Sequence, residues 1–279
     1  MTIADDAPPP LPAGTELAPG YEVLAHLSRG RALDVYDVWS EELQALCVAK
    51  ALRPDRMRHA GARRRLRNEG RLLLGLGHPH IVRAYRLIER PHPIVVLEAL
   101  TGATLAYLVD TRPRRMPLTE LAYLGLQLCS AIGYLHRNGV LHLDLKPSNI
   151  VSEQGMAKVI DLSLARPPGP GPRGLGTRQY LAPEQARGGV FTEAADVWGI
   201  GGVLYRAAAR RRPFEGLDDD GAYAQLTHRA PPIASYRRLP PTLGGAIDRC
   251  LEPDPARRPT LTELWDALEG FMPPEPGPS

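Results

Sequence analysis

The stretch HLDLKPSNI, residues 142–150, places an acid at Asp144, a cation at Lys146 and an amide at Asn149 close together. An apolar run that follows ends in a second acid, Asp161. Two carboxylates, one ammonium group and one amide in a single loop cluster are the groups needed to handle a phosphate, a metal ion and the proton of a hydroxyl. The alternative interpretation is a polar loop with an Asx turn.

Lysine usage favours the chemical interpretation. Only three of the 34 basic residues are lysines, namely Lys50, Lys146 and Lys158, and the others are arginines. Where the two types are interchangeable, a chain with this bias would use arginine, so a retained lysine indicates a need for a compact ammonium group. Lys146 lies in the stretch above, and Lys50 ends a short apolar run.

Length and composition indicate a soluble globular protein. The 279 residues are enough for one large or two small domains, and 43% hydrophobic with 23% charged residues are ordinary values. A net charge of +3 marks neither a nucleic-acid nor a membrane binder. Three distant cysteines argue against a disulfide framework or a zinc site, and we therefore expect a reducing, cytoplasmic compartment. Nothing resembles a targeting or membrane-spanning segment.

The chain divides into a strand-rich part and a helix-rich part. We expect disordered, proline-rich tails at 1–18 and 273–279. Short apolar runs between glycine, serine or charged breaks predict antiparallel strands over 21–52. Helical spacing dominates later. The prediction is an α+β fold with a small β-rich lobe, residues 19–100, and a larger α-helical lobe, residues 101–272.

One predicted helix carries an acid on its apolar side. After Pro54, helical spacing aligns Leu66, Leu73 and Leu76 in a stripe, and Glu69 falls on that stripe. Because a carboxylate that faces the interior needs a cation, we expect Glu69 to pair with a basic residue.

Three further helices follow from spacing and caps. Apolar residues from Leu121 to Leu135 keep helical spacing until Gly139, a residue suited to a C-terminal cap. A second helix is predicted over 192–209. A last amphipathic helix opens with the capping box that Thr260 forms with Glu263.

Over residues 21–271 the chain resembles the protein kinase family, and the motifs occur in the family's order. CVAK, which ends at Lys50, is similar to the third-strand motif, whose lysine holds the α- and β-phosphates of ATP and pairs with a helix glutamate, here Glu69. The resemblance implies a bilobal protein kinase-like fold and ATP as cofactor. It also accounts for the inward-facing Glu69.

The same resemblance assigns roles to the residues of the first stretch. Asp144 matches the catalytic base that accepts the hydroxyl proton of the substrate, and Lys146 matches the contact to the γ-phosphate. Asn149 and Asp161 match the metal ligands, and their oxygen donors suit Mg²⁺ or Mn²⁺.

Downstream motifs point to a protein substrate. GTRQYLAPE, residues 176–184, resembles the end of the kinase activation segment, and Arg258 resembles the family's partner for Glu184. Small-molecule phosphotransferases typically lack these features. The resemblance implies phosphorylation of a protein, and Lys146 together with Thr177 favours serine and threonine over tyrosine.

The resemblance also assigns the remaining nucleotide contacts. The backbone of a hinge at 97–100, which includes Leu97, Glu98 and Leu100, would read adenine. Five apolar residues would form the walls of the nucleotide site: Leu27, Val35, Val48, Val151 and Ile160.

The glycine-rich loop departs from the family's pattern. Its three glycine positions are Ser28, Gly30 and Leu33, so one glycine survives. Because backbone amides approach phosphates most closely where no side chain intervenes, we expect weaker or differently shaped nucleotide binding. The family's Asp-Phe-Gly motif reads DLS from Asp161, which keeps the metal ligand.

A second departure concerns activation. The arginine that usually precedes the catalytic acid is Leu143, and in the family that arginine receives a phosphorylated activation-loop residue. Residues 165–175 contain no serine, threonine or tyrosine. The receiver and the phosphorylation site are missing together, so we expect a non-RD kinase without an activation-loop phosphoswitch.

Two other functions compete with an active kinase. A pseudokinase, acting as a nucleotide-sensing or scaffolding module, is favoured by the degraded glycine loop and opposed by the intact polar residues. A nucleic-acid binder is suggested by the basic stretch 56–67, but no interleaved aromatics supply base stacking. We expect a solvated helix face there, open to an acidic partner, and neither a nucleic-acid nor a membrane partner.

The arginine bias suggests a GC-rich bacterial source. The subgroup that the chain then resembles is the eukaryotic-like (Hanks-type) serine/threonine kinases of bacteria.

Overall fold

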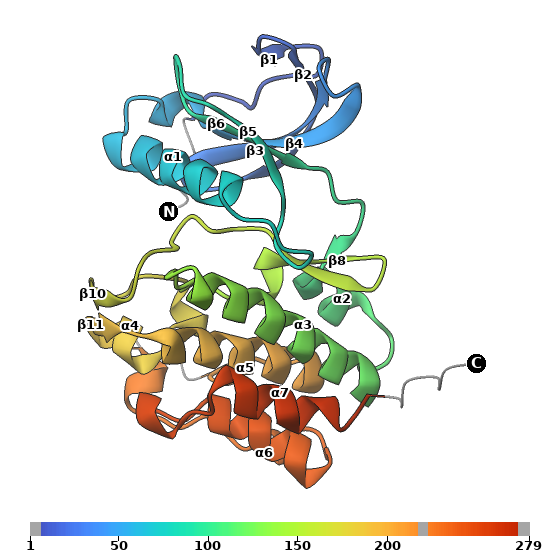
Figure 1. The fold of residues 1–279 in the computed structure, drawn as a ribbon, viewed down its shortest axis with the longest axis vertical. Coiled ribbons are helices and arrows are strands. Elements are labelled where there is room, and N and C mark those ends of the chain that lie inside the picture. Colours follow the sequence, from blue (N-terminus) through green and yellow to red (C-terminus); the bar gives the residue numbers. More distant parts are fainter. Residues whose placement is uncertain (1–6, 217–222, 273–279) are drawn as a thin grey trace. The chain divides into compact units, whose positions relative to one another are not determined.

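Within residues 7–216 and 223–272, which this computed structural model describes, the predicted strand-rich region forms one six-stranded antiparallel sheet (Figure 1). The strands are β1 (Glu16–Ala18), β2 (Tyr21–Arg29), β3 (Leu33–Ser40), β4 (Ala45–Leu52), β5 (Ala84–Ile88) and β6 (Ile94–Glu98). Their order in the sheet is β1-β2-β3-β4-β6-β5. Every adjacent pair is antiparallel; short connections join β1 to β4 in succession and β5 to β6, whereas α1 and β5 lie between β4 and β6 in the chain.

Alternation along the strands gives this sheet two different faces. Tyr36 and Val38 of β3, with Cys47 and Ala49 of β4, are buried in an apolar cluster on one face. The neighbouring Lys50 points to the other face, because successive side chains of a strand alternate. Helix α1 (Ala60–Leu74) packs against β4, β5 and β6 and covers that second face in part.

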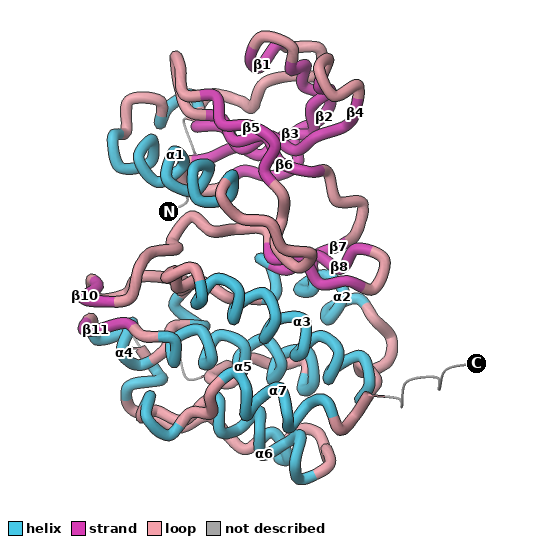
Figure 2. The backbone as a smooth tube through the Cα atoms, in the orientation of Figure 1, coloured by secondary structure: helices cyan, strands magenta, loops and turns pink. Residues whose placement is uncertain are grey.

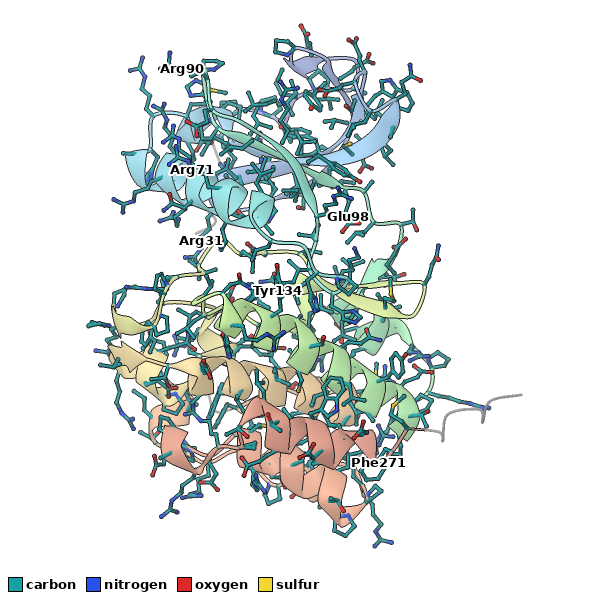
Figure 3. All side chains as sticks on the ribbon, in the orientation of Figure 1. Arg31, Arg71, Arg90, Glu98, Tyr134 and Phe271 are labelled. Carbon is teal, nitrogen blue, oxygen red and sulfur yellow. The ribbon has the colours of Figure 1, made fainter. Side chains whose placement is uncertain are left out.

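Helix α1 confirms the predicted apolar stripe. Leu66, Glu69 and Leu73 are buried, whereas Leu76 lies beyond the end of the helix. The basic stretch 56–67 covers the turn before α1 and the first turns of the helix. On the helix, Arg64 is exposed on the outer side. Further along this helix, Arg71 lies outward and pairs with a glutamate at 2.8 Å (Figure 3).

The proline-rich segment before the sheet corrects one expectation. Residues 7–18 do not form a disordered tail, because Glu16–Ala18 is paired with β2 and Leu11 and Leu17 pack against the apolar cluster. The backbone amide of Leu11 also donates a hydrogen bond to Tyr36 Oη at 3.1 Å. An extended proline-rich segment can cover an apolar face when its few leucines lie against that face, and composition alone did not reveal this.

The rest of the described chain is mainly helical (Figure 2). Its helices are α2 (Leu105–Thr111), α3 (Leu118–Arg137), α4 (Pro183–Arg187), α5 (Glu193–Ala209), α6 (Pro241–Cys250) and α7 (Leu261–Glu269). Two short sheets, which we did not predict, join β7 (Ala103–Thr104), β8 (Ile150–Glu153) and β9 (Met156–Val159), and β10 (Gly169–Gly171) with β11 (Gly189–Phe191). Single 3-10 turns lie at Pro54–Arg56, Pro147–Asn149, Arg178–Tyr180, Ala224–Leu226, Ile233–Ser235 and Pro255–Arg257.

The three later helices predicted from spacing and caps are confirmed. Helix α3 ends one residue before Asn138, and Gly139 follows with a φ of 71°. Helix α5 begins after Thr192, as predicted. At the start of α7, Thr260 Oγ1 accepts from the Glu263 amide at 3.2 Å, and the Glu263 carboxylate accepts from the Thr260 amide at 2.7 Å.

The chain divides into two compact units, one formed by 1–78 with 82–101 and the other by 79–81 with 102–279. Our predicted lobes met at 100/101, and no motif indicated that 79–81 belongs with the second unit. The first six residues of the predicted N-terminal tail and the whole predicted tail from 273 lie outside the described residues. In the described part of the chain, no helix combines the length and apolar character that a membrane crossing requires.

Candidate active site

Lys50 and Glu69 form a buried ion pair in the first unit. Lys50 Nζ lies 2.7 Å from Glu69 Oε1, so the predicted pairing is confirmed. Glu69 is brought to the sheet by a close approach of α1: a Cβ at Gly70 would lie 2.8 Å from a methyl carbon of Val95, the residue paired with Lys50 across β4 and β6. Each charge compensates the other where water is excluded.

In the second unit, the predicted catalytic residues converge on the carboxylate of Asp144. Lys146 Nζ donates to Asp144 Oδ2 at 2.8 Å, and Asn149 Nδ2 donates to the same oxygen at 3.3 Å. The Thr177 amide donates to Oδ1 at 2.8 Å, and Thr177 Oγ1 accepts from Lys146 Nζ at 2.6 Å. Groups up to 33 residues apart in sequence therefore surround one acid.

The shape of this loop depends on helix α5. Asp196 accepts hydrogen bonds from the amides of His142 and Leu143, both at 2.8 Å. Leu143 has a φ of 65°, a left-handed conformation that is costly for a bulky residue. Its carbonyl accepts from Gln185 Nε2 at 2.8 Å, which holds the same residue from the other side. Sequence reasoning used Asp196 only as part of the helix predicted over 192–209, without its contacts to this loop, and it assigned no part to Gln185.

His142 supports the loop as a neutral ring. Burial lowers its pKa, because the charged imidazolium loses its hydration, although the nearby carboxylates of Asp196, Asp144 and Asp161 oppose this. His142 Nδ1 accepts from the Asp144 amide at 3.1 Å, so the ring proton is assigned to Nε2. The ring therefore positions the backbone of Asp144 and carries no charge at neutral pH.

Asn149 and Asp161, the predicted metal ligands, lie at the same end of the β8–β9 hairpin. The ladder pairs Ile150 with Val159, and the amide of Ile160 donates to the Asn149 carbonyl at 3.0 Å. Asn149 Nδ2 donates to the Asp144 carbonyl at 3.0 Å, so the side-chain oxygen is the atom that the predicted metal site would use. One carboxylate and one amide oxygen fit a hard divalent cation that keeps phosphate and water ligands.

Several predicted nucleotide contacts lie on the Lys50 face of the sheet. Val35 pairs directly with Lys50, and Val48 pairs directly with Leu97, so their side chains share this face. Leu27, on β2, is half exposed.

The predicted hinge begins where β6 ends. Glu98 is the last residue of β6 (Figure 3), and its carboxylate accepts from the Arg83 amide at 2.9 Å. The Glu98 amide donates back to the Arg83 carbonyl at 2.9 Å. Leu100 follows outside the strand. The remaining wall residues, Val151 and Ile160, belong to the second unit, where Val151 is buried and Ile160 half-buried.

Glu184 and Arg258 form the pair that the motifs implied. Two guanidinium nitrogens of Arg258 donate to the two carboxylate oxygens of Glu184, at 2.6 and 2.8 Å. The same guanidinium lies 5.0 Å from the ring centroid of Trp198 on α5. The end of the activation segment is thereby attached to the helical interior.

Comparison with protein families matches residues 21–267 to the protein kinase domain. The chain is 31% identical over 259 residues to the serine/threonine-protein kinase PknB of Mycobacterium tuberculosis H37Ra, covering 88% of this chain and 41% of that protein. It is 32% identical over 252 residues to the DNA damage-responsive serine/threonine-protein kinase RqkA of Deinococcus radiodurans R1, covering 87% and 37%. The chain belongs to the protein kinase domain family.

A solved structure supports the fold. The kinase domain of Mycobacterium tuberculosis PknI, crystallised as a point mutant, matches with a TM-score of 0.74 over 94% of this chain and 99% of that one, at 23% identity. This likeness confirms the predicted α+β protein kinase-like fold. The relatives are bacterial kinases, and the chain spans about two fifths of the length of the curated proteins quoted above.

Proposed function

We propose that the protein transfers the γ-phosphate of ATP to a serine or threonine hydroxyl of a protein substrate. The observation that carries this proposal is the Asp144 carboxylate, held between Lys146 Nζ and the Thr177 amide, each at 2.8 Å. A carboxylate in this position can accept a hydroxyl proton, and the adjacent ammonium group can stabilise phosphoryl oxygens. The serine/threonine specificity in the names of the bacterial relatives agrees with it.

The proposed reaction assigns one task to each polar residue. The substrate hydroxyl oxygen attacks the γ-phosphorus, its proton passes to Asp144, and the bond to the leaving ADP oxygen breaks. Lys146 stabilises charge on the transferred group, and Lys50, held by Glu69, binds the α- and β-phosphates. Because this transfer is mainly a matter of positioning and electrostatics, the fixed geometry around Asp144 is what the protein supplies.

Asn149 and Asp161 would hold Mg²⁺ or Mn²⁺ in this scheme. When bound, the cation neutralises phosphate charge and orients the phosphate oxygens. Adenine would be read by the backbone of Glu98 and Leu100. The walls of that site would be Leu27, Val35, Val48, Val151 and Ile160, with Gly30 of the nucleotide loop and Leu97 of the hinge as further contacts.

The first test is transfer from γ-labelled ATP, with Mg²⁺ or Mn²⁺, to the protein itself and to a generic basic protein. We expect transfer by the native chain and a fall in kcat/KM of roughly 10²-fold or more in Lys50→Met, because one preorganised cation at the phosphates is lost. Lys158→Met is the matched control, since it removes a lysine without a proposed role and should leave the rate unchanged.

A pseudokinase is the second candidate, favoured by the side chains at Ser28 and Leu33 of the nucleotide loop. It predicts nucleotide binding without transfer under every metal condition. Calorimetric titration with ATP beside the transfer assay separates the two functions, because native protein that binds ATP and transfers no phosphate would establish the pseudokinase.

We also propose that this non-RD kinase works without an activation-loop phosphoswitch. Leu143 offers no cation to a phosphate, and 165–175 lacks phosphorylatable residues. Backbone contacts already attach this segment: Arg166 exchanges two hydrogen bonds with Leu141, at 2.8 and 3.0 Å, and β10 pairs with β11. These backbone hydrogen bonds order the loop without a phosphate group.

Dephosphorylation should therefore leave activity unchanged. We expect the initial rate of phosphatase-treated protein to stay within about twofold of untreated protein, since no new arginine–phosphate pair is needed to order the segment. Phosphopeptide mapping checks the same point. A dominant site between Asp161 and Glu184 whose removal lowers the rate would contradict the proposal.

A reducing, cytoplasmic location remains our proposal. It is supported by Cys47, Cys129 and Cys250, which are buried and free of disulfides.

A further inference from the structure

The loop that lacks two family glycines is a short, closed hairpin in the first unit. Only three residues, 30–32, separate β2 from β3, and the ladder pairs Arg29 with Asp34 at the neck of the loop. The Gly30 amide donates to the Leu33 carbonyl at 2.8 Å, which closes the turn. Arg31 lies at the tip of this loop (Figure 3).

A fully buried acid clamps the neck of the hairpin. Arg29 binds Asp34 through two hydrogen bonds, Nε to Oδ1 at 2.8 Å and Nη2 to Oδ2 at 2.9 Å. His26 Nε2 lies 3.3 Å from Oδ1, and Tyr36 Oη donates to Oδ2 at 3.3 Å. Bidentate pairing of this kind fixes orientation as well as distance. Burial alone would raise the pKa of Asp34, but Arg29 and His26 hold that pKa below its usual range.

The tip of the loop is held separately by Arg53, the residue that follows β4. Arg53 Nη1 donates to the Gly30 carbonyl at 3.2 Å, and the Arg53 amide donates to the Ala32 carbonyl at 3.0 Å. The Arg53 side chain is itself buried and paired with Asp55 at 3.0 Å. Two of the three loop carbonyls are therefore held by one residue.

The N-terminal segment closes over the same clamp. Arg29 Nη1 donates to the Pro8 carbonyl at 2.8 Å. Tyr36 Oη accepts from the Leu11 amide at 3.1 Å while it donates to Asp34. Residues 8–11, here called the strap, thus contact Arg29 and Tyr36, two of the three partners of Asp34. Because successive side chains of a strand alternate and Val35 faces the Lys50 side, the clamp lies on the opposite face of the sheet from Lys50, the proposed phosphate contact.

We propose that Arg29 and Asp34 are positioning residues of the nucleotide loop, and that the strap holds them in place. This proposal rests on the proposed use of ATP. A glycine-rich loop approaches phosphates through its conformational freedom, but a loop with side chains at Ser28 and Leu33 has less of it. The clamp fixes the conformation of the loop before the nucleotide binds, so less conformational entropy is lost on binding.

The test is a comparison of KM for ATP with kcat. In Arg29→Ala we expect KM for ATP and the Kd of a fluorescent ATP analogue to rise about tenfold, with kcat and KM for the protein substrate within about twofold, because only preorganisation of the loop is lost. Arg29→Lys keeps the positive charge but loses the two parallel hydrogen bonds of the guanidinium group. Its KM for ATP and its nucleotide Kd should lie between those of the native protein and those of Arg29→Ala. Arg64→Ala removes an exposed arginine from the outer side of α1, outside the nucleotide loop, and should change neither constant.

A second variant covers the case in which Arg29→Ala fails to fold. Deletion of residues 1–9 removes the Pro8 carbonyl and keeps Leu11, and it should raise KM and Kd for the nucleotide about threefold, because Arg29 loses its contact with the strap and keeps its contacts with Asp34. Unchanged nucleotide Kd in folded Arg29→Ala and in the deletion variant would overturn the proposal, as would a fall in kcat without a change in Kd. Absence of phosphate transfer by the native chain would refute only the proposed function, because nucleotide Kd is measured independently of transfer.

Discussion

Asp144→Asn is expected to lower kcat for phosphoryl transfer by roughly 10³-fold while nucleotide affinity is retained. Asparagine keeps the size of the side chain and an oxygen for the Thr177 amide, which now lies 2.8 Å from Asp144 Oδ1. It cannot accept the hydroxyl proton. Its amide would also point a donor at Lys146 Nζ, which needs an acceptor at 2.8 Å.

Initial rates with γ-labelled ATP, run beside nucleotide titration and thermal unfolding, check this result. Asp110→Asn is the matched control, because it makes the same change on the exposed side of α2 and should leave kcat unaltered. More than a tenth of native kcat in folded Asp144→Asn would show that this carboxylate is not the base.

Glu184→Ala is expected to reduce the free energy of unfolding by about 3–5 kcal/mol, because it leaves a buried guanidinium without its anion. The Arg258 side chain has no exposed surface, and both Glu184 oxygens accept from it, at 2.6 and 2.8 Å. The Ala194 carbonyl accepts from the same group at 2.8 Å but carries only a partial charge. Urea denaturation of the native and variant proteins measures the difference.

Two comparisons separate this effect from general damage. The double variant Glu184→Leu with Arg258→Met removes both charges and should recover most of the loss, since apolar groups of similar size replace the pair. Arg229→Ala breaks an exposed ion pair with Glu252 and should cost less than about 1 kcal/mol. A loss below that value in Glu184→Ala would contradict the assignment of Arg258 as a buried, anion-dependent charge.

Patterns within one element predicted the structure well. Glu69 was located by helical spacing, because a stripe that includes Leu66 and Leu73 can only face the interior, and an acid on it needs a cation. The same argument, applied to a strand, would have found Asp34, which lies on the same face as the buried Tyr36 and Val38. Sequence reasoning missed it because that strand was considered for its apolar residues, such as Val35, and the direction of its acidic side chains was not examined.

Composition was a poorer guide than periodicity. The segment 7–18 was predicted to be disordered from its prolines, yet Leu11 and Leu17 pack against the apolar cluster of the sheet. A high proline content indicates only that a segment does not form a helix or a central strand. Whether the segment is ordered depends on an apolar surface elsewhere in the chain, which no local pattern describes.

The sequence by itself determined which chemical groups the protein carries and on which face of its helix or strand each group lies. Side-chain direction within an element follows from a period of 3.6 residues in a helix or 2 in a strand. The order of motifs also identified Asp144, Lys146, Asn149 and Asp161 as one set. Only the tertiary structure decided which distant groups hold that set in shape. Asp196 meets Leu143 across 53 residues of chain, and Arg29 meets Pro8 across 21, because such contacts depend on how whole elements pack and not on the local period of either partner.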